Sequence, residues 1–162
     1  MIEIARIIAD YGPGLGRVAA SYEADPALQE DLLQEILIAI HRALPSLENP
    51  ASLAPFVFRI AHNRSVTHVV KRAGERRRAA QDAAEAELDS ATPEQLLIAD
   101  ERARRLTAAV RRLPLRYRQV ITLLLEDLSY AEIAEALEIS LSNVGVRVNR
   151  AKAQLRTMLD DA

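Results

Sequence analysis

Hydrophobic residues recur every three to four positions along most of this chain, which is the period of amphipathic α-helices. Between Asp25 and Pro45 the apolar positions are Leu32, Leu33, Ile36, Leu37, Ile40 and Leu44. Asp25 followed by Pro26 predicts the start of this helix, because Asp caps free backbone N–H groups and Pro suits the first helical position. No segment of the sequence alternates apolar and polar residues as a strand does, so we expect an all-α fold.

Glycine and proline residues place the other helices of the first half. We expect residues 11–14, Tyr-Gly-Pro-Gly, to separate a short amphipathic segment from a second helix. The apolar positions of that second helix are Leu15, Val18, Ala19 and Tyr22. A long helix should then begin near Ser52 and tolerate Pro55 in its first turn. Its expected core positions are Leu53, Phe56, Val57, Ile60 and Ala61.

Similar signals predict two helices between residues 92 and 126. Residues 92–95, Thr-Pro-Glu-Gln, form a capping box with Pro at the first helical position, and the helix that they open should end at Leu113-Pro114. Its apolar positions are Leu96, Leu97, Leu106 and Val110. A further helix is predicted from about Tyr117 to Glu126, with apolar positions Val120, Ile121, Leu123 and Leu124.

The last third of the chain predicts a helix-turn-helix. Ser129 and Glu132 form a capping box, after which Ile133, Ala134 and Leu137 share one helical face. A second helix should begin after Ser140, with apolar positions Leu141, Val144 and Val148. Its positive charges are Arg147, Arg150, Lys152 and Arg156, and no acidic residue stands between Ser140 and Leu159. This layout is typical of a recognition helix that enters a major groove of DNA.

Charge is segregated along the 162 residues, although the formal net charge is only −2. Residues 1–78 carry 10 Lys or Arg against 9 Asp or Glu, residues 79–101 carry none against 7, and residues 102–162 carry 11 against 7. An Ala-rich acidic stretch with few large apolar residues favours solvation over packing. We therefore predict two small helical domains, 1–78 and 92–162, joined by an acidic flexible linker at 79–91.

Several classes of function are disfavoured by what the sequence lacks. It has no cysteine for disulfides or thiolate metal sites, and no apolar run of the roughly 20 residues that a bilayer requires. Its histidines are His41, His62 and His68, and the last two are six residues apart rather than the four that suit one metal. No Gly-rich phosphate loop is present. We expect a cytoplasmic protein that is not an enzyme, with no cofactor, metal, small-molecule ligand or membrane insertion.

One face of the helix after Asp25 carries a stripe of polar residues with one isoleucine among them. Its members are spaced i, i+3, i+4, i+7 and i+11, and they are Asp31, Gln34, Glu35, Ile38 and Arg42. We call this set the docking stripe. It has two interpretations from spacing alone, a solvated face with one stray apolar residue or a docking surface for a partner helix.

A basic ridge follows on the third long helix. It consists of Arg64, His68, Lys71 and Arg72, with Arg76, Arg77 and Arg78 just beyond. Such a ridge attracts phosphate backbones through counterion release, although basic ridges are also often simply solvated. Phe56 has core spacing and is expected to be buried, whereas Phe58 is expected to be exposed and able to stack on bases.

Together these motifs resemble the extracytoplasmic-function class of bacterial RNA polymerase sigma factors. The resemblance rests on Tyr11-Gly12-Pro13, on Glu30-Asp31-Leu32-Leu33-Gln34-Glu35, on residues 56–63 (Phe-Val-Phe-Arg-Ile-Ala-His-Asn), and on Leu113-Pro114 with the helix-turn-helix. It implies binding to core RNA polymerase and to promoter DNA, with region two in the first domain and region four in the second.

The resemblance also assigns roles to residues. The docking stripe would bind the clamp helices of the polymerase β′ subunit. Recognition and opening of the −10 element would involve Glu48, Asn49, Ser52, Phe58, Arg59, Asn63, Arg64, His68, Lys71 and Arg72. The −35 element would be bound by Ser142, Asn143, Val146, Arg147, Arg150 and Lys152. Asn143 and Arg147 are the candidates for base edges, and Arg150 and Lys152 for phosphates.

Four positions depart from the family pattern. Phe56 replaces a usual Trp, His41 another aromatic residue, Glu138 the turn glycine, and Gly145 a frequent lysine of the recognition helix. The family's promoter sequence therefore does not carry over. Because the chain ends soon after the last helix, we expect control by an anti-sigma factor that covers the docking stripe or wedges between the domains.

Three other interpretations remain open. A sigma-like decoy would titrate an anti-sigma factor without initiating transcription. A stand-alone helix-turn-helix regulator would bind duplex DNA without polymerase and would not respond to Gln34→Ala. An RNA-processing or hydrolytic enzyme is a more distant alternative, and it would show turnover without polymerase.

Overall fold

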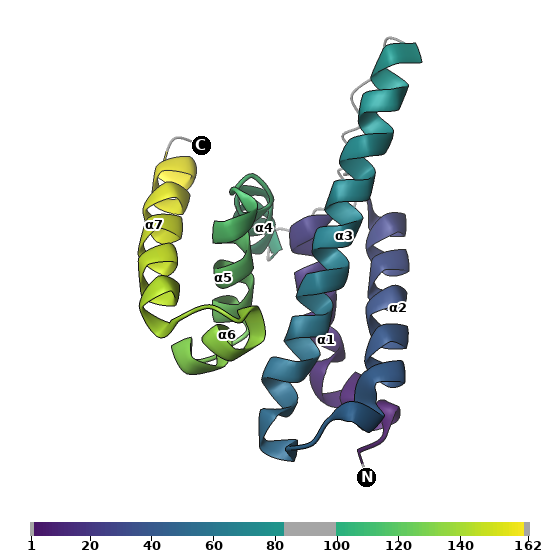
Figure 1. The fold of residues 1–162 in the computed structure, drawn as a ribbon. Helices are drawn as coiled ribbons and strands as arrows, with labels where there is room; N and C mark the ends of the chain where they lie inside the picture. Colours follow the sequence, from purple (N-terminus) through teal and green to yellow (C-terminus); the bar gives the residue numbers. More distant parts are fainter. Residues whose placement is uncertain (1, 83–99, 161–162) are drawn as a thin grey trace.

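The computed structural model describes residues 2–82 and 100–160, and the regular structure in this part of the chain is entirely helical (Figure 1). The elements are α1 (Ile4–Tyr22), α2 (Pro26–Ala43), the short 3₁₀ turns η1 (Leu44–Ser46) and η2 (Pro50–Ser52), α3 (Leu53–Asp82), α4 (Glu101–Arg111), α5 (Leu115–Leu125), α6 (Tyr130–Leu137) and α7 (Leu141–Asp160). The predicted all-α fold is confirmed. None of the described helices combines the length and hydrophobicity that a bilayer crossing requires.

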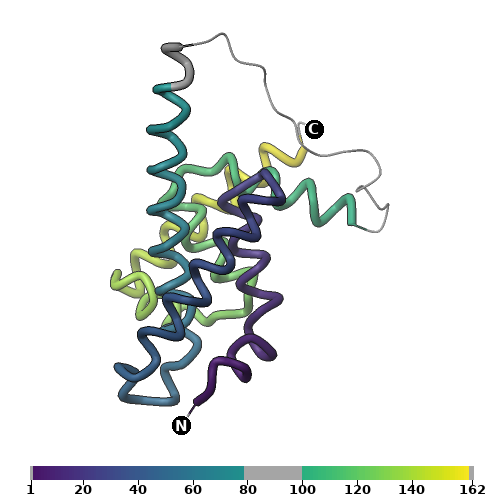
Figure 2. The backbone as a smooth tube through the Cα atoms, turned by 90° about the vertical axis from the view of Figure 1, so that its right-hand side faces the viewer, coloured from purple at the N-terminus to yellow at the C-terminus, as the bar shows by residue number. Residues whose placement is uncertain are grey.

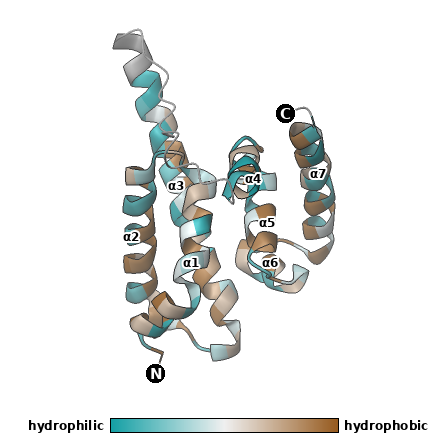
Figure 3. Cartoon of the chain, turned by 180° about the vertical axis from the view of Figure 1, so that it is seen from behind, coloured by the Kyte–Doolittle hydropathy of each residue, from teal (hydrophilic) through white to brown (hydrophobic). Residues whose placement is uncertain are grey.

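The first three helices form a bundle around a core of aliphatic side chains. This N-terminal unit buries Leu15, Val18, Leu32, Ile36, Ile40 and Val57 almost completely. The predicted start of α2 is confirmed, because the Asp25 side chain accepts a hydrogen bond of 3.0 Å from the Ala27 N–H and Pro26 is the first helical residue. Figures 1 and 2 show the C-terminal end of α3 extending beyond the other helices, and Figure 3 shows that this end is largely hydrophilic.

The predicted break at residues 11–14 is wrong, since α1 continues through Pro13 without interruption. A proline inside a helix removes one hydrogen bond and crowds the carbonyl four residues earlier, at a cost of about 3 kcal/mol. Burial on both sides of Pro13 offsets this cost. Ile7 and Leu15 are 1% and 0% exposed, and the continuous helix keeps both side chains on the side that packs into the bundle core.

The remaining helices form a C-terminal unit in which α5 packs against α7 and α6 lies beside both. Its core includes Val110, Val120, Ile133, Val144 and Val148, each fully buried. The capping box at the start of α6 is confirmed in both directions, from the Glu132 N–H to Ser129 Oγ and from the Ser129 N–H to Glu132 Oε1. Leu141 shares the helical period of Val144 and Val148, but it is 56% exposed.

Part of the predicted linker and of the helix predicted to open at residues 92–95 lies outside the described residues. The predicted capping box at 92–95 is among them, as are Leu96 and Leu97. Helix α3 reaches Asp82, so it includes residues 79–82, which the sequence had placed in the linker. Helix α4 ends at Arg111, just before the predicted stop at Leu113-Pro114.

The two units pack against each other. Helix α1 contacts α4 and α5, and α3 contacts α5 and α6. The side of the N-terminal unit formed by α1 and α3 therefore faces the helix-turn-helix, while α2 lies on the far side (Figure 1). This packing determines which candidate residues are covered and which are exposed.

Candidate nucleic-acid interface

Helix α7 exposes the face that the sequence assigned to the −35 element. Ser142, Asn143, Val146 and Arg150 are exposed and Arg147 is half-buried, while the opposite face is held in the core by Val144, Val148, Ala151 and Leu155. At 100° per residue, positions 142, 143, 146, 147 and 150 fall within one sector of the helix. Lys152 is also exposed, but it lies on the other edge of the buried stripe. The structure therefore brings five of the six candidates together.

The turn before α7 has an unusual backbone conformation for its residue. Glu138 has φ 57° and ψ 44°, the left-handed region that glycine adopts without strain. Ser140 then starts α7, since its Oγ accepts a hydrogen bond of 3.1 Å from the Asn143 N–H. The Glu138 carboxylate lies 3.8 Å from Nη1 of Arg59, a residue of the other unit.

The loop assigned to the −10 element borders a cavity of about 260 Å³. Its lining residues are Ser46, Leu47, Glu48, Asn49, Ser52, Phe56, Arg59 and Glu135. The Asn49 side chain accepts a hydrogen bond from the Ala51 N–H and so fixes the start of η2, which leaves its amide N–H groups as donors. A polar loop beside an aromatic ring is suited to an unstacked base.

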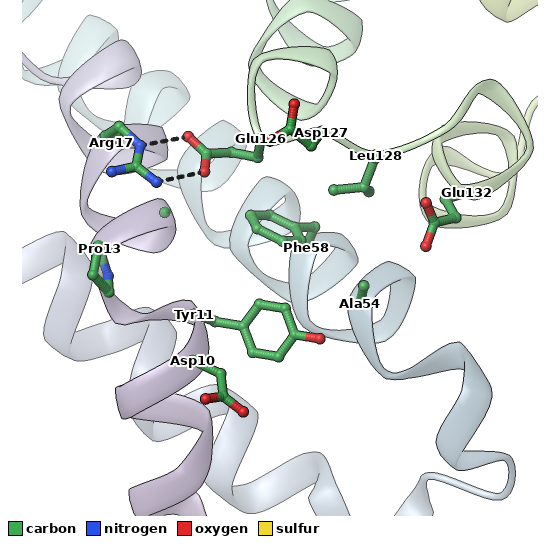
Figure 4. Close-up of a pocket in the computed structure, with 11 residues that line it drawn as sticks. Asp10, Tyr11, Pro13, Arg17, Ala54, Phe58, Glu126, Asp127, Leu128 and Glu132 are labelled. Atoms are coloured by element: carbon green, nitrogen blue, oxygen red, sulfur yellow. Dashed lines mark hydrogen bonds and ion pairs between the residues drawn. The ribbon is translucent and has the colours of Figure 1, made fainter.

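The expected exposure of Phe58 is wrong, and Phe56, which was expected to be buried, packs only partly against the core. Phe58 is only 3% exposed, whereas Phe56 is half-buried and lines the loop cavity. Phe58 packs edge-on against Tyr11, with ring centroids 5.9 Å apart, and it faces the C-terminal unit near Leu128 (Figure 4). The spacing along α3 could not show this, because the residues that cover Phe58 come from α1 and from beyond α5.

Two members of the basic ridge are bound to a buried glutamate. The Glu23 side chain is 3% exposed, and its Oε1 lies 2.7 Å from His68 Nε2 and 3.1 Å from Arg72 Nε. Burial would raise the pKa of Glu23, but the hydrogen bonds from the Asp25 N–H and His68 and the charge of Arg72 hold it below its ordinary value. Glu23 thus joins the end of α1 to α3, a role that no local sequence signal indicated.

Part of the ridge faces the docking stripe. A groove of about 400 Å³ between α2 and α3 is lined by Glu35, Ile38, Ala39, Arg42, Arg64, Thr67, His68 and Lys71. All five stripe residues are exposed, Ile38 by 51%, and Asn63, Arg64 and Lys71 are exposed as well. The sequence treated the stripe and the ridge as separate surfaces, but the structure places part of each along one groove.

The sequence missed an ion pair that joins the two units. Arg17 Nε and Nη2 donate to the two carboxylate oxygens of Glu126 at 2.8 and 2.9 Å, as Figure 4 shows. Nearby, Arg111 donates to the Ala20 carbonyl at 2.7 Å, and the Arg118 guanidinium lies 5.2 Å from the Tyr22 ring centre. These partners are about a hundred residues apart in sequence, so no motif could reveal them.

The described residues contain no group of three or more His, Asp or Glu side chains arranged to hold a metal ion. His62 is half-buried in the N-terminal unit, and burial lowers its pKa to about 4, so its ring is neutral at pH 7. The exposed face of α7 carries hydrogen-bonding and basic groups, and the docking stripe carries charged and amide groups around an exposed isoleucine. Such surfaces are suited to binding nucleic acid and protein.

Comparison with known proteins matches each unit to a family model. The model described as Sigma-70 region 2 matches residues 7–75, and the one described as Sigma-70, region 4 matches residues 103–155. The first match falls on α1–α3 and the second on α4–α7.

Whole-chain relatives agree with these matches. The chain is 30% identical over 131 residues to the ECF RNA polymerase sigma-E factor of Escherichia coli strain K12, which covers 75% of this chain and 69% of that protein. It is 28% identical over 141 residues to the ECF RNA polymerase sigma factor SigW of Bacillus subtilis, covering 82% and 75%. Among solved structures, RpoE of Bartonella quintana in complex with the anti-sigma factor NepR superimposes with a TM-score of 0.73 at 23% identity, covering 96% of each chain.

Proposed function

The chain belongs to the extracytoplasmic-function sigma factors of the sigma-70 family, and on this premise we propose how its residues direct core RNA polymerase to promoters. One observation carries the proposal. A single chain exposes a recognition face on α7 and, on the far side of the other unit, a polar stripe around the exposed Ile38. A stand-alone regulator would need only the first of these surfaces.

The docking stripe binds polymerase. Ile38 supplies an apolar anchor that loses contact with water on binding, and the polar members around it fix the orientation of a partner helix. Asp31, Gln34, Glu35 and Arg42 present both charges and an amide, which suits the clamp helices of the β′ subunit. Since α2 is covered by neither α6 nor α7, this surface is available in the free chain.

The −10 element is handled by the loop cavity and by the exposed part of the ridge. Glu48, Asn49 and Ser52 hydrogen-bond to opened bases, and Phe56 takes the stacking role that the sequence gave to Phe58. Asn63, Arg64 and Lys71 contact the phosphate backbone, together with Arg59 once it is released from the C-terminal unit. His68 and Arg72 act indirectly, because Glu23 already binds them.

The −35 element is read in the major groove by α7. Asn143 and Arg147 reach base edges, Val146 contacts a thymine methyl group, and Arg150 binds phosphate with Ser142 beside it. Lys152 binds the backbone of the opposite strand, which follows from its position on the other edge of the helix. Gly145 carries no side chain, so the backbone of α7 can approach the DNA closely at this position.

The action of the protein is binding rather than catalysis, and it takes place in the cytoplasm with the polymerase. An anti-sigma factor regulates it. The structural relative RpoE was solved in complex with the anti-sigma factor NepR, which supports a partner of this class. Such a partner would cover the docking stripe or separate the two units.

Run-off transcription with purified core polymerase and a promoter library tests the proposal. Wild-type chain is expected to give promoter-specific transcripts, and Gln34→Ala with Ile38→Ala is expected to abolish them by weakening polymerase binding. Arg6→Ala is the control, because Arg6 lies on an exposed part of α1 in a solvent-exposed ion pair with Asp10. Binding of duplex promoter DNA without polymerase, unaffected by the double substitution, would favour the stand-alone regulator. Absence of transcripts from every promoter, with an anti-sigma factor still bound, would favour the decoy.

A further inference from the structure

The basic ridge of α3 contains residues that face solvent and residues that are largely covered. Arg64 and Lys71 are exposed. The side chains of His68 and Arg72 are only 13% and 29% exposed. Arg64, His68 and Lys71 line the same groove between α2 and α3, and Arg72 directly follows Lys71. The covered members therefore belong to the surface that would meet the DNA backbone.

Glu23 is the group that holds the covered members. Its Oε1 lies 2.7 Å from His68 Nε2 and 3.1 Å from Arg72 Nε, and its Oε2 accepts a hydrogen bond of 2.9 Å from the Asp25 N–H. Burial raises the pKa of this carboxyl group, but the hydrogen bonds from Asp25 and His68 and the charge of Arg72 hold it below its ordinary value. Glu23 is therefore ionised at pH 7.

The backbone around Glu23 fixes the position of this carboxylate. Glu23 is the first residue after α1, and its N–H donates to the Ala19 carbonyl at 3.0 Å. Its own carbonyl accepts a hydrogen bond of 2.7 Å from the Gln29 side chain on α2. Glu23 is thus bonded to α1, to α2 and, through His68 and Arg72, to α3. A counter-charge fixed in this way stays with the ridge when DNA approaches.

Burial makes this counter-charge more effective than an exposed one. Glu35 faces the same groove from α2, but it is exposed, so water and salt screen its charge. The Glu23 side chain is 3% exposed and contacts Arg72 directly, so its charge is screened far less. An arginine whose charge is already balanced does not neutralise a phosphate, and it releases no counter-ion from DNA.

We propose that Glu23 is a positioning residue of the −10 surface, which withholds His68 and Arg72 from the DNA backbone and so sets how many phosphates the ridge binds. The inference rests on the −10 role proposed above for Arg64 and Lys71. With Glu23 in place, the affinity of the chain for DNA of any sequence stays low. Base contacts in the loop cavity then decide where the chain binds.

This role and a purely structural role predict different effects of removing the carboxylate. Loss of a structural tie lowers stability and either weakens DNA binding or leaves it unchanged. Loss of a counter-charge frees Arg72, adds one phosphate contact and strengthens DNA binding at low salt. For single-stranded DNA, each phosphate contact adds about 0.7 to the slope of log affinity against log salt concentration.

Binding of a fluorescein-labelled single-stranded DNA of mixed sequence tests the proposal. Anisotropy measures the affinity of the full chain from 50 to 200 mM NaCl at pH 7, at a temperature where circular dichroism shows each variant to be folded. Glu23→Gln is expected to steepen the salt slope by about 0.7. Its gain in affinity over wild type should therefore grow by roughly 2.6-fold as the salt falls from 200 to 50 mM.

Three further variants identify the source of that change. Glu30→Gln removes the same formal charge from an exposed position and is expected to leave the slope unchanged. Adding Arg72→Gln to Glu23→Gln is expected to return the slope to its wild-type value, because Arg72 supplies the additional contact. Arg64→Gln is the reference for one lost phosphate contact, and its slope should be shallower by about 0.7.

A slope for Glu23→Gln that equals that of wild type or is shallower would overturn the proposal, and so would a steeper slope that Glu30→Gln reproduces or that Arg72→Gln does not reverse. If Arg64→Gln still reduces the slope in that case, the ridge keeps its −10 role and Glu23 is a structural tie only. An unchanged slope with Arg64→Gln would instead contradict the −10 role of the ridge in the proposed function, and the role of Glu23 with it.

Discussion

Replacing Glu23 by glutamine is expected to destabilise the N-terminal unit strongly, although the two side chains have nearly the same size. The carboxylate accepts hydrogen bonds from the Asp25 N–H at 2.9 Å, from His68 at 2.7 Å and from Arg72 at 3.1 Å. Glutamine keeps one acceptor oxygen but removes the charge that Arg72 faces. Breaking a buried ion pair costs about 3–5 kcal/mol. Partial exposure of the Arg72 side chain, 29%, reduces this to about 2 kcal/mol.

The pH dependence of this effect has a defined sign. The pKa of Glu23 is held below its ordinary value in the folded chain, so its contribution to stability is present above the unfolded pKa and is lost as the pH falls through the folded pKa. The difference in unfolding free energy between wild type and Glu23→Gln should therefore be largest near pH 7 and shrink toward pH 3.

Urea unfolding followed by circular dichroism measures both effects. At pH 7 a loss of about 2 kcal/mol corresponds to a fall in Tm of roughly 4–8 °C for a chain of this size. Glu30→Gln is the matched control, because Glu30 is exposed on the neighbouring helix and should change stability little. Equal stabilities for the two variants, or a difference that stays constant from pH 7 to pH 3, would refute the role assigned to Glu23.

Four further substitutions have defined outcomes. Glu138→Gly should raise the free energy of unfolding measured in urea. Relief of the left-handed strain contributes about 1–2 kcal/mol, which exceeds the cost of about 0.5–1 kcal/mol from the greater freedom of glycine in the unfolded chain. A net loss of stability would contradict this. Gly145→Ala should stabilise the fold by up to about 1 kcal/mol and so raise the Tm, since the added methyl group meets only Tyr130 at 4.0 Å. A lower Tm would reveal a clash. Arg147→Ala should relax the base preference at one position of the promoter by about 1–3 kcal/mol in a promoter-selection assay. Lys152→Ala should weaken binding to all sequences alike. The reverse pattern would exchange the roles of these two residues.

Local signals predicted much of the fold. The Asp25-Pro26 start of α2 and the Ser129–Glu132 capping box are confirmed because the hydrogen bonds that define them lie within a few residues of one another. The continuity of α1 through Pro13 was not predicted, because burial of Ile7 and Leu15 by other helices decides it. A local rule for proline could not include that tertiary contribution.

The candidate site was predictable where side chains point to solvent and not where the two units meet. Helical spacing placed the docking stripe and most of the α7 face correctly on exposed surfaces. It assigned the wrong phenylalanine to the surface, since Phe58 is covered by Tyr11 and by the C-terminal unit. It gave no sign of the Arg17–Glu126 pair, whose partners are 109 positions apart.

We propose that this chain brings core polymerase to promoters and opens the −10 region. Permanganate footprinting of a promoter selected by run-off transcription measures that opening directly, through the reactivity of unpaired thymines. With core polymerase and wild-type chain, thymines in the −10 region should become reactive, and they should stay unreactive with the Gln34→Ala and Ile38→Ala double variant. Reactivity that appears with the chain alone, or that is unchanged by the double variant, would contradict the claim.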